Sequence, residues 1–166
     1  MATAYLSLGS NQDAEAHLSR AIGELRQRFG ELQVSPLYRT AAIGFDGADF
    51  LNAAAIIDTE LDPVALDAWL HALEDAHGRR RDQPRFSDRP LDIDIVFYDQ
   101  LVLRGPGNLE LPRPELRHAF VLKPLADLAP DYRVPLDGRT LAELWRAHPE
   151  HDAPPQAQPW PAARGA

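Results

Sequence analysis

Apolar and polar positions alternate with two different periods in the first part of the chain. Four segments alternate or run apolar as strands do: residues 4–8, 32–38, 50–57 and 92–98. Two segments carry apolar residues at helical spacing: residues 18–29 and 63–77. The order is therefore β-α-β-β-α-β, the order of ferredoxin-like α+β domains. We predict an antiparallel sheet with both helices on one face, and with the other face and the strand ends free to hold ligands.

Capping residues support these helices. Asn11 or Asp13 is placed to cap the first helix after a turn at Gly9, and Asp62 precedes Pro63 at the start of the second. Glycine ends a helix without strain because it adopts positive φ angles, and Gly78 stands in that place for the second helix. The second helix therefore has the clearest local signals in the chain.

The part of the chain that follows residue 98 predicts a small extension of this core. It contains a hairpin over 101–111, a short helix over 120–128 and a capped helix from Thr140. From residue 149 onward, five prolines and few apolar side chains predict a disordered tail over 149–166. We expect a single domain over 1–148 followed by this tail.

Composition narrows the class of protein. The 166 residues suffice for one domain with a hydrophobic core, and the absence of cysteine excludes disulfides and zinc–thiolate sites. No apolar run approaches the ~18 residues of a membrane span, and the N-terminus lacks a signal-peptide pattern. We expect a monomeric cytoplasmic protein without a membrane partner.

Charge is distributed unevenly. The whole chain has a net charge of −8, whereas residues 78–89 carry five arginines and two aspartates. One positive segment on an acidic protein argues against nucleic-acid binding and favours a small anionic ligand. The only lysine, Lys123, does not belong to a Gly-Lys-Ser/Thr loop, so a Walker-type phosphate loop is missing.

Two aspartates follow this basic segment at the start of a predicted strand. Alternate strand residues share a face, so Asp92 and Asp94 project the same way with backbones ~6.5–7 Å apart. Carboxylates are hard ligands for Mg²⁺, and arginines form forked bonds to phosphate. Arg79 and Arg81 point the same way in an extended run, while Arg80 points away. The pattern favours a magnesium polyphosphate, against the alternative of acids that merely solvate a strand end.

Three further residues have two interpretations each, and a fourth has one. Asn52 lies among apolar residues, so its amide either makes a structural hydrogen bond or recognises the edge of a heterocycle. Glu74 is either a helix-surface acid or a ligand-facing one. Phe86 either stacks on a nucleobase or anchors its loop, and His118 is first interpreted as a surface histidine.

Six motifs follow one another between Ala4 and about Asp131: Leu8-Gly9-Ser10-Asn11, Tyr38-Arg39-Thr40, Phe50-Leu51-Asn52-Ala53, Glu74-x-x-x-Gly78-Arg79-x-Arg81, Arg89-x-Leu91-Asp92-Ile93-Asp94-Ile95 and Phe120-Val121-Leu122-x-Pro124-Leu125. In this order and near this spacing, they resemble the 6-hydroxymethyl-7,8-dihydropterin pyrophosphokinases of folate biosynthesis. The resemblance implies a ferredoxin-like fold and transfer of pyrophosphate from MgATP to the pterin hydroxymethyl group, with release of AMP.

The same resemblance implies roles for individual residues. Asp92 and Asp94 would hold two Mg²⁺ ions and, with Arg79 and Arg89, form the catalytic set. The pterin would be bound by Thr40, Ile43, Phe50, Asn52 and Phe120. ATP would be contacted by Glu74, Arg79, Arg81, Arg85, Phe86, Arg89, Arg113 and His118.

The chain departs from the family pattern in places. Arg113 stands where the family has the histidine of Pro-His-Pro, and His118 stands near the position of a family arginine. Dependence on a charged His118 would make activity fall as pH rises past neutrality. Phe86 replaces a tryptophan, and Ala41 replaces a proline. These changes leave open a divergent paralogue that acts on a different pterin.

Two other classes of protein remain possible from the sequence. A magnesium-dependent nucleotidyltransferase or phosphatase would use the same aspartates and arginines. A non-catalytic ligand-binding or RNA-binding module would use a similar four-stranded sheet, although the overall acidity argues against it.

Overall fold

The first part of the chain forms the predicted elements, with one strand divided in two. The computed structural model describes residues 1–42, 47–78 and 90–161. Through residue 98 its elements are β1 (Ala2–Ser10), α1 (Ala14–Phe29), β2 (Gln33–Val34), β3 (Leu37–Thr40), β4 (Phe50–Thr59), α2 (Pro63–Ala76) and β5 (Asp92–Tyr98). The predicted strand over 32–38 is split at Ser35-Pro36, because proline has no N–H group for the ladder.

The sheet is antiparallel throughout and has the strand order β5-β1-β4-β3-β8, with β2 also paired to β4. The long strand β1 lies between β4 and β5, and its Gly9 pairs with Asn52 on one side and Asp92 on the other. Gly9 is therefore a strand residue, and the turn predicted there begins after Ser10. The predicted ferredoxin-like α+β core is confirmed.

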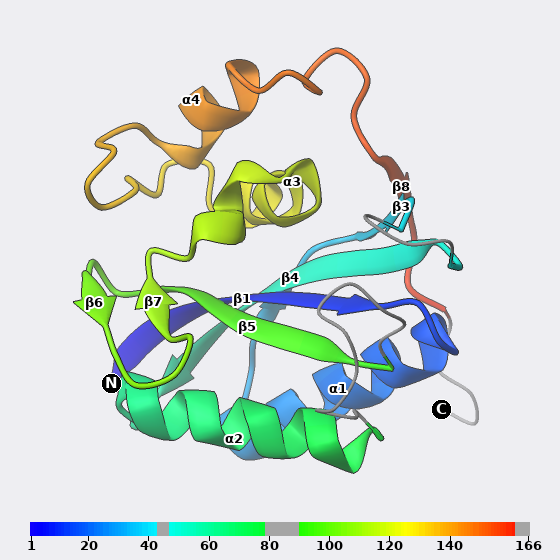
Figure 1. The fold of residues 1–166 in the computed structure, drawn as a ribbon, viewed down its shortest axis with the longest axis vertical. Helices are drawn as coiled ribbons and strands as arrows, with labels where there is room; N and C mark the ends of the chain where they lie inside the picture. Colours follow the sequence, from blue (N-terminus) through cyan, green and yellow to red (C-terminus); the bar gives the residue numbers. More distant parts are fainter. Residues whose placement is uncertain (43–46, 79–89, 162–166) are drawn as a thin grey trace.

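Helices lie on both sides of this sheet (Figure 1). The predicted pair, α1 and α2, covers one face. The main core lies between these helices and the sheet and contains Leu6, Leu18, Leu70 and Ile95. The extension adds α3 (Ala119–Leu128) and α4 (Leu141–Arg146) above the opposite face, over a second core. The second face is thus partly covered, where we expected it to be free.

A bulge between β1 and β5 places two consecutive residues of β5 in the second core. The register between β1 and β5 shifts between Tyr5 and Leu6, so that Val96 and Phe97 both lie in the second core although they are neighbours in sequence. An extra residue in one strand changes the face of the residues beyond it. Ile95 therefore packs under α1 and α2, whereas Phe97 packs under the C-terminal extension.

Two of the three predicted helix starts are confirmed. The side chain of Asp62 accepts a hydrogen bond from the Ala65 N–H at 2.8 Å, and Thr140 forms a complete capping box with Glu143. The start of α1 is different. Asp13 is its N-cap residue but has a left-handed conformation and no side-chain capping hydrogen bond, while the Asn11 amide donates to the Ala48 carbonyl.

The C-terminal region contains the predicted hairpin, formed by β6 (Leu103–Arg104) and β7 (Glu110–Leu111), followed by the 3₁₀ helix η1 (Pro114–Arg117). The predicted disorder of the tail is wrong for its described part. Strand β8 (Gln156–Gln158) pairs with β3, and the Trp160 indole donates to the Ser35 carbonyl at 2.7 Å. An edge strand offers unpaired backbone groups, which an extended proline-rich segment can use.

No helix within residues 1–42, 47–78 and 90–161 combines the length and the apolar character that a membrane span requires.

Candidate active site

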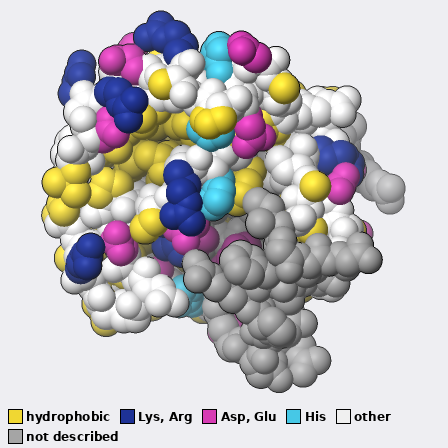
Figure 2. Space-filling view, turned by 45° about the horizontal axis from the view of Figure 1, so that its top comes forward, with side chains coloured by type: hydrophobic (Ala, Val, Ile, Leu, Met, Phe, Trp, Pro, Cys, Tyr) yellow, Lys and Arg dark blue, Asp and Glu magenta, His cyan; other side chains and the backbone are white. Residues whose placement is uncertain are grey.

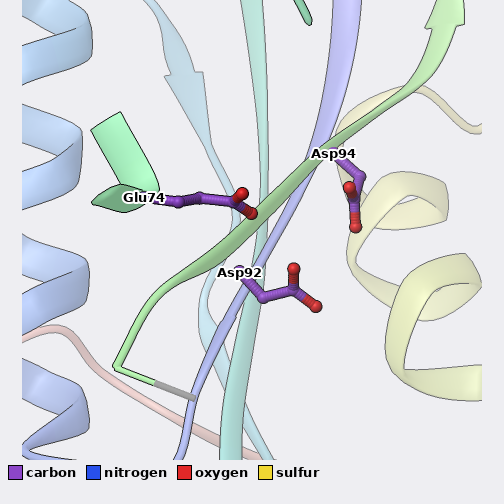
Figure 3. A group of neighbouring side chains, drawn as sticks. All are labelled: Glu74, Asp92 and Asp94. Carbon is purple, nitrogen blue, oxygen red and sulfur yellow. The ribbon is translucent and has the colours of Figure 1, made fainter. Parts of the chain in front are cut away.

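Three carboxylates from two elements meet at the edge of the sheet (Figure 3). Oxygen atoms of Glu74, Asp92 and Asp94 all lie within 4.8 Å of one another. Asp92 and Asp94 share the face of β5 opposite Ile93 and Ile95, as their spacing predicts. Each of the three acids offers oxygen ligands of the kind that Mg²⁺ prefers.

Glu74 reaches this cluster from the last part of α2. Its side chain is buried, with 1% of the residue exposed, and its Oε2 accepts a hydrogen bond from the Ile93 N–H at 2.9 Å. Strand β5 is the edge of the sheet in the described part of the chain, so Glu74 takes the place of a neighbouring strand as the acceptor for this N–H. Of the two interpretations of Glu74, the exposed helix-surface acid is therefore wrong.

Arg113 contacts the same cluster from the segment before η1. Its Nη2 lies 3.2 Å from Asp94 Oδ1, and its Nε lies 3.3 Å from Glu115 Oε2. The Arg113 N–H also donates to the Val96 carbonyl on β5 at 3.1 Å. The sequence predicted a nucleotide contact for Arg113, and the structure places its guanidinium beside a carboxylate of the candidate metal site.

The electrostatics of the cluster favour a cation. Partial burial raises the pKa of Asp94 well above its usual value, and the neighbouring charges of Asp92 and Glu74 raise it further, while Arg113 opposes them. Carboxylates held close together repel one another until a cation neutralises them. The donor set and its charge therefore fit a magnesium ion.

The candidate pterin residues of β3 and β4 lie together on the same face of the sheet. Asn52 is 4% exposed, and its Nδ2 donates to Thr40 Oγ1 at 2.8 Å. Phe50 is partly exposed and pairs with Thr40, two register positions from the pair of Asn52 with Tyr38. The structural hydrogen bond considered for Asn52 is present. It uses a donor of the amide and leaves the amide oxygen near Gly9.

Gly9 is a site residue whose role sequence analysis missed. A Cβ atom at this position would lie 2.9 Å from the Oδ1 of Asn52, closer than real Cβ atoms approach. Glycine therefore permits the approach of β1 to the Asn52 side chain. The available signal was a glycine that interrupts the alternation of β1, but it was interpreted as the start of a turn.

His118 and Phe120 lie side by side at the start of α3. Their rings stack with centroids 5.0 Å apart and planes 9° from parallel. Partial burial, followed by the nearby charge of Arg117, lowers the pKa of His118. Any contribution from the charge of His118 is therefore lost at a lower pH than for an ordinary histidine. Glu115, the second partner of Arg113, is another residue that sequence analysis did not single out.

The remaining predicted site residues lie outside the described residues. They are Ile43 on the pterin side and Arg79, Arg81, Arg85, Phe86 and Arg89 on the nucleotide side. Figure 2 shows basic, acidic and histidine side chains gathered where the described surface meets these undescribed segments. The described part of the site thus comprises the acid cluster with Arg113, the group around Asn52 and the rings at the start of α3.

Comparisons with known proteins identify the family of the chain. Residues 5–130 match the family model described as 7,8-dihydro-6-hydroxymethylpterin-pyrophosphokinase. The chain is 41% identical over 155 residues to the 2-amino-4-hydroxy-6-hydroxymethyldihydropteridine pyrophosphokinase of Pseudomonas aeruginosa, covering 87% of this chain and 91% of that protein. It is 41% identical over 148 residues to the protein of the same name from Methylorubrum extorquens, covering 86% and 91%.

The fold is also found in solved structures. A crystal structure of wild-type Plasmodium falciparum HPPK-DHPS superposes with a TM-score of 0.71 at 14% identity, covering 88% of this chain and 44% of that one. The chain thus spans less than half the length of that structure. The resemblance predicted from six motifs is confirmed by the family match and by these relatives. The chain belongs to the 7,8-dihydro-6-hydroxymethylpterin-pyrophosphokinase family.

Proposed function

We propose that this protein transfers pyrophosphate from ATP to the hydroxymethyl group of 6-hydroxymethyl-7,8-dihydropterin, in the folate pathway. The observation that carries the proposal is the placement of Asn52 and Asp92 on one face of the sheet, both paired with Gly9. The amide that we propose for the heterocycle and the carboxylate that we propose for the cation therefore lie two strands apart. Family membership and the names of the relatives support the same reaction.

The pterin would be held at the β3–β4 end of this face. The Asn52 oxygen is an acceptor for N–H groups on the edge of the heterocycle, and its own N–H already bonds Thr40. Phe50 and Phe120 would contribute aromatic surface for the ring, since flat heterocycles stack well on such side chains. Because His118 stacks on Phe120 in this structure, Phe120 has at most one ring face for the pterin.

The polyphosphate would be held at the β5 end. Asp92 and Asp94, with Glu74 behind them, would hold Mg²⁺, which supplies charge neutralisation for the phosphate oxygens. We propose two ions, as in the expectation from the resemblance. Arg113 offers a forked donor for phosphate, and the basic segment over 78–89 would complete the nucleotide contacts.

The reaction joins the hydroxymethyl oxygen of the pterin to the β-phosphorus of ATP and breaks the bond between that phosphorus and the oxygen that leaves with AMP. No nucleophilic side chain is required. The protein's contribution is to bring the two substrates together in line and to surround the transferred group with compensating charge. The separation of the two sites across β1 suits this role because one substrate binds on each side of it.

Product analysis tests the proposal. The protein is incubated with MgATP and the hydroxymethyl dihydropterin, and the products are separated by ion-exchange chromatography. We expect AMP and a pterin diphosphate in equal amounts, and neither product when magnesium is replaced by EDTA. ADP or free pyrophosphate as the nucleotide-derived product would instead indicate a phosphotransferase or nucleotidyltransferase.

The cytoplasmic location and the monomeric state stay predictions from the sequence. Size-exclusion chromatography with light scattering tests the second, with a monomer mass of 18.5 kDa expected.

A further inference from the structure

Arg113 has an unusual position for a nucleotide contact. Its Nη2 lies 3.2 Å from Asp94 Oδ1, an oxygen that belongs to the candidate metal ligands. Its own side chain is 16% exposed and that of Asp94 is 25% exposed, so water screens the pair only in part. The guanidinium therefore occupies one of the carboxylates that a metal ion would need.

The backbone holds Arg113 in this place. Its N–H bonds the Val96 carbonyl, two residues beyond Asp94 on β5, and Leu116 donates a hydrogen bond back to the Arg113 carbonyl. The side chain can therefore change its partner while the main chain stays attached to the strand. A change of partner needs only rotation about side-chain bonds.

Hydrogen bonding is incomplete on the Nε side of the Arg113 guanidinium, away from Asp94. The Nε of Arg113 and the Oε2 of Glu115 are 3.3 Å apart and buried, yet neither atom makes a hydrogen bond to a residue that the structure describes. Buried polar atoms without hydrogen bonds are costly, and arginine is a much better partner for phosphate oxygens than this geometry provides. The present arrangement of Arg113 therefore leaves capacity for an anionic ligand.

We propose that Arg113 is an exchangeable counterion of Asp94, which neutralises this carboxylate in the metal-free protein and turns to the phosphates when metal and nucleotide bind together. The inference rests on the proposed function. A free divalent ion must displace Arg113 from Asp94 without providing it with a new partner. A metal–nucleotide complex provides the phosphates as that partner. Arg113 consequently weakens the binding of free metal and strengthens that of the complex, which couples the two ligands.

The test measures the affinity for Mn²⁺, a paramagnetic substitute for Mg²⁺, by electron paramagnetic resonance. Titrations are made with and without α,β-methylene-ATP, which is not cleaved. Arg113→Met removes the guanidinium and keeps an unbranched apolar stem. Arg117→Met is the matched control, since Arg117 is an exposed arginine at the other end of η1 and changes the net charge equally.

In Arg113→Met we expect free Mn²⁺ to bind roughly tenfold more tightly, because the ion no longer has to displace a guanidinium from Asp94 or to bind beside its positive charge. With the nucleotide analogue, the same variant should bind Mn²⁺ more weakly than the wild type. Arg117→Met should change both affinities by less than about twofold, because exposed charges at a distance are screened.

Each of the following results would overturn the inference. Free Mn²⁺ affinity is unchanged or weaker in Arg113→Met, or both affinities fall together, as they would if Arg113 only supported the fold. Equal tightening in Arg117→Met would assign the effect to net charge alone. Wild-type protein that binds no Mn²⁺ even with the analogue would instead refute the proposed function, and this inference with it.

Discussion

Asn52 and Asp92 lie in one row across the sheet, each paired directly with Gly9 of the strand between them. Side chains of directly opposed residues project from the same face, so the two lie two strand spacings apart, about 10 Å. Gly9 places no side chain in that interval. A pterin bound by Asn52 and a metal bound by Asp92 would therefore face each other across Gly9 of β1.

This row predicts that Gly9→Ala impairs the pterin site selectively. The new methyl group would meet Asn52 Oδ1 at 2.9 Å and push the amide away. Steady-state kinetics should show the KM for the pterin raised about tenfold, with the KM for ATP changed much less, since small displacements of a positioning group are costly. Equal effects on both substrates would contradict this role for Gly9.

Gly23→Ala is the matched control for that substitution. Gly23 lies within α1, and a Cβ atom there would have no neighbour within 4 Å. Alanine is a better helix former than glycine, so the variant should gain about 0.5–1 kcal/mol in free energy of unfolding. Its kinetic constants should equal those of the wild type.

Asp94→Asn tests the candidate metal site. The substitution keeps the shape of the side chain but removes a charged ligand, so we expect magnesium-dependent turnover to fall by about 10²–10³-fold. The midpoint of urea unfolding in EDTA should stay near the wild-type value, because lost repulsion from Asp92 compensates in part for the lost ion pair with Arg113. Near-normal turnover would rule out the assignment. Asp131→Asn, at an exposed acid, is the control.

Glu74 is expected to have a structural and an electrostatic role that two variants separate. Glu74→Ala leaves the Ile93 N–H without its acceptor and should cost about 1–3 kcal/mol in free energy of unfolding. Glu74→Gln retains an acceptor oxygen and lowers the negative charge beside Asp94, so the metal-free protein should keep its stability. Both variants should bind Mn²⁺ more weakly. A Glu74→Gln variant with unchanged Mn²⁺ affinity would leave Glu74 only its structural role.

The burial of His77 predicts that the free energy of unfolding depends on pH. Its side chain is fully buried, with Nε2 2.9 Å from Glu24 Oε1 and Nδ1 2.8 Å from His17 Nδ1. Burial lowers the pKa of His77, an effect that Glu24 opposes only in part. The unfolded chain therefore takes up a proton near pH ~6.5 while the folded protein does not, so stability falls as pH drops below this value.

Urea unfolding at a series of pH values, from about 7.5 to below ~6.5, measures this effect. One group changes the free energy of unfolding by at most ~1.4 kcal/mol per pH unit. His77→Gln should remove that part of the slope, whereas His71→Gln, at a half-exposed histidine, should retain it. The same slope in wild type and His77→Gln would show that other groups cause it.

The C-terminal segment is predicted to contribute to stability. Trp160 packs against the main core and donates to the Ser35 carbonyl at 2.7 Å. Trp160→Ala should lower the free energy of unfolding by about 1–2 kcal/mol, and Trp160→Phe by about half as much, because it keeps apolar contact but loses the hydrogen bond. Gln156→Ala, at an exposed side chain of β8, should change it by less than about 0.5 kcal/mol. Chemical denaturation followed by circular dichroism tests these values, and an unaffected Trp160→Ala would indicate a loosely attached segment.

The sequence predicted the elements that depend on local rules. The order of strands and helices, the caps at Asp62 and Thr140, and the shared face of Asp92 and Asp94 follow from periodicities and hydrogen bonds within a few residues. The tail was predicted wrongly because its composition has little apolar content, whereas β8 forms by pairing with the free edge of β3. Such pairing depends on a partner far away in the chain.

The sequence by itself therefore determined which residues were available for a site and which of them share a face of their own strand. Only the tertiary structure decided how they meet: Glu74 at the free edge of β5, Arg113 on Asp94, and Asn52 and Asp92 on either side of Gly9. The physical reason is that register between strands, and the docking of α2 and η1 on an edge, are set by the packing of the whole core. No spacing within one segment encodes them.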